Sequence, residues 1–137
     1  MQMNPYLSFK GDCEAAFSFY ERTLGGEPGS IFRYGGSPMA GDVPADWSDK
    51  VMHGSVTLGR QVLMGADVAP HQYEAPTGFS LSLQIKSTAE AERIFTQLAE
   101  GGRVVLPLAR TFWAERFGMV VDRFGVPWML NCEGTGQ

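Results

Sequence analysis

The sequence offers few side chains of the types that carry out catalytic or metal chemistry. Its two histidines are His53 and His71, and its two cysteines are Cys13 and Cys132. His53 lies in an alternating segment typical of a β-strand, where an imidazole can act as a general base or as a pH-sensitive ligand contact. The same residue can equally be a half-buried histidine bonded to a neighbour. No nucleophile or carboxylate stands at a spacing that completes a catalytic triad with it, so the catalytic residues stay unassigned.

Composition excludes several classes of function. The chain has 137 residues, of which 44% are apolar and 19% charged, as expected for one packed domain. A formal charge of −4 without any basic run argues against nucleic acid or an anionic membrane as a partner. No apolar stretch approaches the roughly 18 residues of a membrane helix, and the N-terminus lacks the regions of a signal peptide. We therefore expect a cytoplasmic protein with reduced thiols.

Glycines and prolines divide the sequence into short elements whose order repeats. Alternation and turn signals predict strands over residues 4–9, 30–34, 51–58, 61–65, 79–85, 103–108, 116–121 and 126–131. Helical spacing predicts one helix from an N-cap at Asp12 to Gly25, and a second from the capping box that begins at Ser87 to Gly101. The order β-α-β-β-β therefore occurs twice. We interpret it as a single domain of two modules, residues 1–69 and 78–137, joined by connector 70–77.

This order and several short motifs resemble the vicinal oxygen chelate superfamily of glyoxalases, bleomycin-resistance proteins and extradiol dioxygenases, and above all its PhnB-like group. The motifs that carry the resemblance lie at residues 5–12, 15–16, 19–20, 101–104, 111–113, 117–119 and 122–128. The resemblance covers nearly the whole chain. It implies an α+β fold in which two βαβββ modules form curved mixed sheets around a cleft, with the helices outside. It also implies a homodimer, which open sheet edges favour as well.

The resemblance further implies one divalent metal, held by His, Glu or Gln from the first and last strand of each module. Strand parity and the turn glycines carry these positions onto Asn4, Leu63, Ser80 and Met129. Leucine cannot ligate a metal, methionine suits soft ions, and Asn or Ser alone binds a hard or borderline ion weakly. Moving any position by one residue introduces neither His nor Glu. We therefore expect no metal, no cofactor and no metal-dependent activity of the family type.

Polar and aromatic side chains remain as candidates for binding a small molecule in the predicted cleft. They are Asn4, Tyr6, His53, Ser80, Ser82, Gln84, Trp113, Arg116 and Met129. The polar groups either face water or a dimer partner, as one face of an antiparallel sheet often does, or orient a ligand. Trp113 either packs in the protein or stacks on a ligand, and Arg116 is either a surface residue or an anchor for an anionic group.

Three hypotheses for the function follow. The favoured one is a PhnB-like protein that binds a small polar or anionic molecule without the family metal. The alternatives are an enzyme of the superfamily, lyase-, dioxygenase- or transferase-like, that acts on a small metabolite with His53 as base, and a structural or regulatory dimer without a ligand. Some PhnB-like proteins carry a methyltransferase label. This chain has no G-x-G-x-x-G motif after a strand and is short for a methyl-donor-binding domain, so we do not expect that activity.

Overall fold

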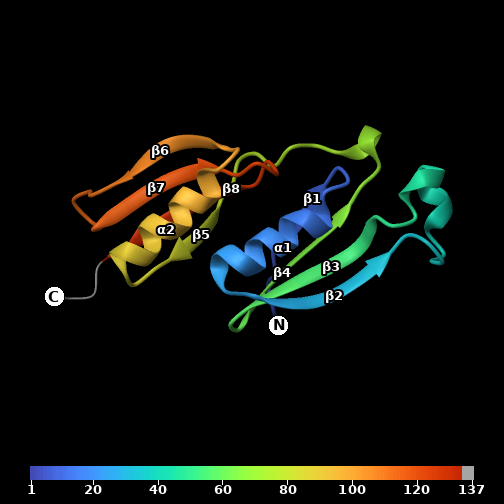
Figure 1. Ribbon diagram of the computed structural model, residues 1–137, viewed down its shortest axis with the longest axis horizontal. Coiled ribbons are helices and arrows are strands. Elements are labelled where there is room, and N and C mark those ends of the chain that lie inside the picture. The colour runs from blue at the N-terminus through green and yellow to red at the C-terminus, as the bar shows by residue number, and fades with distance from the viewer. Residues whose placement is uncertain (134–137) are drawn as a thin grey trace. The chain divides into compact units, whose positions relative to one another are not determined.

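The structure, a computed structural model, describes residues 1–133, and the chain divides into two compact units between Glu74 and Ala75. The first unit contains β1 (Tyr6–Phe9), α1 (Cys13–Leu24), β2 (Glu27–Arg33), β3 (Val51–Leu58) and β4 (Gln61–Asp67) (Figure 1). The second contains β5 (Leu81–Gln84), α2 (Thr88–Ala99), β6 (Arg103–Ala109), β7 (Arg116–Val121) and β8 (Pro127–Cys132). Short 3-10 turns occupy Ala40–Asp42, Ala45–Trp47 and Pro70–Gln72. The predicted βαβββ order is confirmed in both units.

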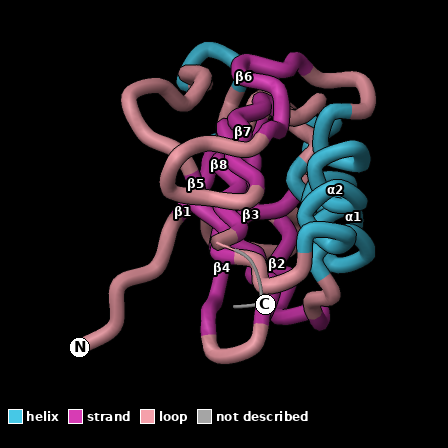
Figure 2. The backbone as a smooth tube through the Cα atoms, turned by 90° about the vertical axis from the view of Figure 1, so that its left-hand side faces the viewer, coloured by secondary structure: helices cyan, strands magenta, loops and turns pink. Residues whose placement is uncertain are grey.

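Each unit is a four-stranded mixed sheet with its helix on one face (Figure 2). The strand order is β1-β4-β3-β2 in the first unit and β5-β8-β7-β6 in the second. The first and last strands of each unit run parallel, β1 beside β4 and β5 beside β8, whereas the remaining pairs are antiparallel. No helix among the described residues has the length and apolar character needed to cross a membrane.

Glycines allow α1 to approach the first sheet closely. Gly54 of β3 and Gly65 of β4 are cross-strand partners, and a Cβ placed on either would lie 3.4 or 3.0 Å from the ring of Phe17. The ring of Phe17 meets that of Phe9 edge-on, with centroids 5.8 Å apart. Because both aromatic rings are buried, they form the centre of the core between α1 and the sheet.

The second unit repeats this arrangement with different residues. A Cβ on Gly118 of β7 would lie 2.8 Å from the ring of Phe95 of α2, so this position of the sheet faces the helix. Its cross-strand partner Leu130 is fully buried, as is Trp128 two residues earlier on the same face. The alternation along β8 therefore sends Met129 and Asn131 to the opposite face.

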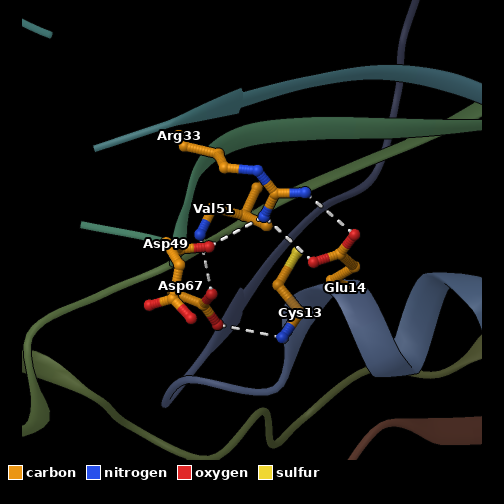
Figure 3. Close-up of polar contacts among 6 residues, drawn as sticks. All are labelled: Cys13, Glu14, Arg33, Asp49, Val51 and Asp67. Atoms are coloured by element: carbon orange, nitrogen blue, oxygen red, sulfur yellow. Dashed lines mark hydrogen bonds and ion pairs between the residues drawn. The ribbon is translucent and has the colours of Figure 1, made fainter. Parts of the chain in front are cut away.

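A carboxylate from β4 caps the N-terminus of α1 (Figure 3). The Oδ1 atom of Asp67 accepts hydrogen bonds from the backbone N–H groups of Gly11 and Cys13, both at 2.9 Å, and its Oδ2 atom accepts one from Val51 at 2.9 Å. Asp12 occupies the N-cap position, as predicted, but its side chain makes no capping bond. Its backbone, at φ −116° and ψ 24°, lies outside the extended region usual for an N-cap.

Replacing Asp67 should destabilise the protein far more than replacing Asp12. Asp67 is 1% exposed, so Asp67→Ala leaves two buried N–H donors and one part-buried N–H donor without their acceptor. At about 1–3 kcal/mol for each unsatisfied group, the free energy of unfolding should fall by at least about 3 kcal/mol. Asp12→Ala, the matched control, should change it by less than about 0.5 kcal/mol. Urea unfolding followed by circular dichroism measures both, and equal losses in the two variants would contradict the capping role of Asp67.

Candidate functional site

The candidate residues lie mainly on the face of each sheet that is opposite its helix, here called the helix-free face. In the first unit Leu7 and Phe9 of β1 are buried on the helix side, so the alternation places Tyr6 on the helix-free face. The register pairs Tyr6 with Met64 of β4, and Met64 with Ser55 of β3. His53, two residues before Ser55, lies on the same face.

Tyr6 and His53 form a hydrogen-bonded pair across the first sheet. The phenol oxygen of Tyr6 lies 3.2 Å from Nδ1 of His53, and the two ring centroids are 5.6 Å apart. Phe32 of β2 adds a third ring, with its centroid 6.3 Å from that of His53. Burial, followed by the nearby Cys13, raises the pKa of Tyr6, so the phenol keeps its proton at neutral pH. A neutral phenol can donate to Nδ1, which leaves the imidazole proton on Nε2.

Asn4, another predicted ligand contact, makes a hydrogen bond within the first sheet. Its Nδ2 atom donates to the backbone carbonyl of Val62 in β4 at 3.1 Å. The bond ties the segment before β1 to the neighbouring strand. The side-chain amide therefore extends the β1–β4 pairing beyond the end of β1.

In the second unit three polar side chains form a hydrogen-bonded row over β5 and β8. Nε2 of Gln84 donates to Oγ of Ser82 at 3.1 Å, and Nδ2 of Asn131 donates to Oε1 of Gln84 at 3.0 Å. We call Ser82, Gln84 and Asn131 the polar row. Met129 is the cross-strand partner of Ser82 and so lies beside the row, and Ser80 directly precedes β5. The structure thus brings together Ser82, Gln84 and Met129 of the predicted set.

An aromatic group stands next to the polar row. Phe117 of β7 is the cross-strand partner of Asn131. The ring of Trp113 meets that of Phe117 with centroids 5.2 Å apart, and Phe112 meets Trp113 at 4.8 Å. The hydroxyl of Thr111 accepts hydrogen bonds from the backbone N–H groups of Trp113 and Ala114, which orders this loop. Trp113 remains 49% exposed, so its indole offers apolar surface beside polar groups.

Arg116 does not join this group. Its partner across β7 and β8 is Cys132, which is fully buried on the helix side. The guanidinium accordingly reaches Glu92 of α2, with Nη2 and an acidic oxygen 3.0 Å apart. The prediction placed Arg116 with the cleft residues because sequence position alone did not show which face of β7 it occupies.

The position predicted for a family ligand at Leu63 also falls on the wrong face. Leu63 is 4% exposed and pairs with the buried Val56 on the helix side, and its neighbour Met64 takes the helix-free face. The hairpin β3–β4 has only two loop residues, whereas β7–β8 has five. Counting from the turn glycine therefore gives the right parity at Met129 and the wrong parity at Leu63.

Sequence reasoning missed Asn131, although a signal for it was present. Asn131 lies two residues after Met129, and both share the face of Gln84 in the parallel partner strand. Strand alternation alone would have included it. Its Oδ1 atom is buried and has no hydrogen-bond partner among the described residues.

The remaining nucleophile and ligand types are dispersed. Within residues 1–133 no group of three His, Cys, Asp or Glu side chains is arranged to hold a metal ion. Cys13 is fully buried at the start of α1 (Figure 3). Burial raises the pKa of its thiol strongly, and the negative charge of Asp67 raises it further. The thiol is therefore protonated at physiological pH and is a poor nucleophile.

Comparison with known proteins shows consistent similarity over the whole chain. A family model described as 3-demethylubiquinone-9 3-methyltransferase matches residues 1–131. Protein YjdN of Escherichia coli is 35% identical over 96% of this chain and 95% of its own length. The crystal structure of protein PA1353 from Pseudomonas aeruginosa is 50% identical with a TM-score of 0.89, covering 98% of both chains. A PhnB protein from Bacillus cereus, titled a putative 3-demethylubiquinone-9 3-methyltransferase, is 27% identical with a TM-score of 0.83, covering 96% of this chain and 99% of its own.

More distant structures show the fold alone. A glyoxalase/bleomycin resistance protein/dioxygenase family enzyme from Burkholderia phytofirmans is 11% identical with a TM-score of 0.67, over 95% of this chain and 96% of its own. The fosfomycin resistance protein FosX from Listeria monocytogenes is 13% identical with a TM-score of 0.64, over 96% of this chain and 92% of its own. These matches confirm the predicted glyoxalase-like fold class.

The buried thiols provide a test of this description. Both cysteines are fully buried, so neither should react with a disulfide reagent such as DTNB in the native protein at pH 8. In urea both should react within seconds to minutes, and the absorbance of the released thiolate counts them. Fast reaction of one thiol in the folded protein would show that Cys13 is more accessible and more acidic than its surroundings imply. Cys13→Ser identifies which thiol has reacted.

Proposed function

We propose a binding function for this chain, which belongs to the family described as 3-demethylubiquinone-9 3-methyltransferase and with it to the PhnB-like part of the vicinal oxygen chelate superfamily. In this proposal the chain binds a small polar molecule on the helix-free face of its second sheet, without the divalent metal of the superfamily. The polar row beside the rings of Trp113 and Phe117 is the observation that carries this proposal. Ligand sites combine apolar and aromatic surface with a few fixed polar groups, as this face does.

The polar row supports binding because its side chains are fixed by hydrogen bonds to one another, whereas side chains that only contact water need no fixed arrangement. Gln and Asn side chains lose rotamer freedom when held in one arrangement, and a surface in contact with water alone gives little in return. Here each amide fixes the next, since Asn131 donates to Gln84 and Gln84 donates to Ser82. Preorganised polar groups of this kind reduce the cost of orienting a bound molecule.

The residue types at the helix-free positions of the first and last strands support the metal-free part of the proposal. On the helix-free face, β1 and β4 pair Tyr6 with Met64, and β5 and β8 pair Ser82 with Met129. No helix-free position of these four strands is a histidine or a carboxylate. Phenol, hydroxyl and thioether groups do not fit a zinc, manganese or iron(II) ion, which prefer imidazole and carboxylate. The same positions include the amides of Gln84 and Asn131, but the oxygen of Gln84 already accepts a hydrogen bond from Asn131. We therefore derive no reaction step through a metal.

Two features of the chain argue against the activity in the family's name. Each sheet contains a single parallel pair, whereas a methyl-donor-binding α/β domain needs a parallel sheet and a glycine-rich loop before a helix. The N–H of Cys13 at the start of α1 is already bonded to Asp67, and Ser87 caps α2 by accepting from Glu90 at 3.2 Å. We infer that this chain does not have the methyltransferase activity that the description of its family names.

The expected ligand is polar and not strongly anionic. The sequence offered Arg33, Arg110 and Arg116 as anchors for an anion, and each is paired with a carboxylate. Arg116 pairs with Glu92 and Arg110 with Glu115. Arg33 makes a bidentate pair with Glu14 at 3.0 Å for both contacts (Figure 3). The same contact lowers the pKa of Glu14. An anion would have to displace these carboxylates, whereas an uncharged polar molecule would not.

A second candidate function is an enzyme that uses the first sheet. The Tyr6–His53 hydrogen bond favours it, because in the tautomer in which Nδ1–H donates to the phenol oxygen the imidazole is oriented and the lone pair of Nε2 is available as a base.

We also infer a homodimer. The edge strands β2 and β6 expose apolar side chains such as Phe32, at 54%, and Val105, at 48%, which a second copy of the chain could cover.

Removing the Trp113 ring should weaken ligand binding about tenfold or more, because stacking on an indole contributes on the order of 1–2 kcal/mol. A panel of amides, amino acids, hydroxy acids and phosphonates is screened by thermal shift, and each hit is titrated by calorimetry against wild type and Trp113→Leu. The control Phe79→Leu removes an equally exposed ring, at 49%, from the segment before β5. Equal affinity in wild type and Trp113→Leu, or no hit at all, would contradict the proposal. Stoichiometric metal in protein purified without chelator would contradict its metal-free part.

A further inference from the structure

The carbonyl oxygen of Asn131 is the unusual atom of the polar row. It is buried from solvent and accepts no hydrogen bond from any described residue. Buried side-chain oxygens in folded proteins nearly always have a partner, because leaving an acceptor unpaired after desolvation is costly. The amide nitrogen of the same side chain is already bonded to Gln84. The row therefore ends in an acceptor that lacks a donor.

The direction of the hydrogen bonds along the row decides whether its free end at Asn131 needs a donor or an acceptor. Each amide donates toward Ser82, so the oxygen of each amide points the other way, toward Asn131 and beyond. Turning the Asn131 amide alone would set its oxygen against Oε1 of Gln84, which is also an acceptor. The row must therefore turn as a whole or remain as it is. In the observed direction its free end needs a donor, whereas the reversed row would end in the Asn131 amide nitrogen and need an acceptor.

Aromatic side chains lie on the strand and loop next to Asn131. Phe117 is directly opposite Asn131 in the β7–β8 pairing, at a distance where cross-strand side chains touch. Trp113 packs on Phe117 and is half exposed, and Phe112 beyond it is 96% exposed. A planar molecule whose donor reaches Oδ1 could therefore also stack on these rings.

We propose that the second sheet recognises a planar, uncharged molecule that carries an N–H donor, such as an aromatic or conjugated primary amide, with the donor bound to Oδ1 of Asn131 and the plane against Trp113 and Phe117. This inference rests on the proposed function and specifies its ligand class. Neither a carboxylate nor a ketone meets the requirement, because neither donates a hydrogen bond.

Two isosteric probes test this directly. Benzamide and acetophenone have the same ring and carbonyl, and they differ only in an NH2 group that replaces a CH3 group. Binding is followed by the shifts of the Asn131 side-chain amide and the Trp113 indole N–H in ¹⁵N-resolved NMR spectra of the full chain. Benzamide should bind about tenfold more tightly than acetophenone, the ratio expected when one donor satisfies a buried acceptor. Equal affinities, or tighter binding of acetophenone, would overturn the proposal.

Two variants assign the preference to Asn131. Asn131→Leu removes the acceptor, so the benzamide-to-acetophenone ratio should fall to about one. Asn131→Asp keeps an acceptor at the same position if the Gln84 amide turns so that its nitrogen donates to the other carboxylate oxygen and its Oε1 accepts from Ser82. The preference for benzamide should then persist, and this variant decides the question if Asn131→Leu does not fold. Phe79→Leu, the control outside the row, should retain the wild-type ratio. A ratio that survives in Asn131→Leu would overturn the assignment.

The same experiment separates this inference from the proposed function. If panel compounds bind and depend on Trp113 but benzamide shows no advantage over acetophenone, the binding function stands and the donor rule is wrong. If no compound shifts the Trp113 signal, the proposed function itself fails. Shifts confined to Tyr6 and His53 would place binding on the first sheet and overturn both.

Discussion

The buried carboxylate of Asp67 is the interaction on which the first unit depends. It accepts hydrogen bonds from the loop before α1, from the first residue of α1 and from the first residue of β3 (Figure 3). Its own carbonyl oxygen accepts from the hydroxyl of Tyr34 at 2.6 Å. One residue at the end of β4 thus joins segments that are far apart in the sequence. A buried charge is tolerated there because both carboxylate oxygens are bonded to N–H groups.

The second unit reaches the same topology by a different set of contacts. Its helix is capped locally, by Ser87, and its buried carboxylate Asp122 holds the β7–β8 hairpin by accepting from the backbone of Phe124 and Val126. Asp122 also accepts from the indole nitrogen of Trp128 at 2.8 Å. The longer hairpin changes which residues of β8 face away from the helix. Two similar folds therefore present different helix-free faces, one with the Tyr6–His53 pair and one with the polar row.

Local signals in the sequence predicted the elements well, and long-range contacts account for what it missed. The capping box at Ser87 and the two-residue turn after Leu58 are read within a few positions, so α2 and the hairpin β3–β4 were found. The cap of α1 was assigned to Asp12 because Asp67 is 54 residues away from Cys13 in the sequence. The face occupied by Arg116 depends on its pairing with Cys132, and that register cannot be read from β7 alone.

The two faces of each sheet differ in their packing, and this difference indicates where a binding site can lie. The helix side is filled by close contacts, such as Phe17 over Gly54 and Gly65, and Phe95 over Gly118, and a methyl group added at Gly65 or Gly118 would collide with its neighbours. Substitutions on that side are limited by packing, whatever the protein binds. No helix packs against the other side, so helix packing does not limit the residues there. An ordered polar row with a buried, unpaired acceptor in that position is costly for stability, and the donor proposed above would remove this cost.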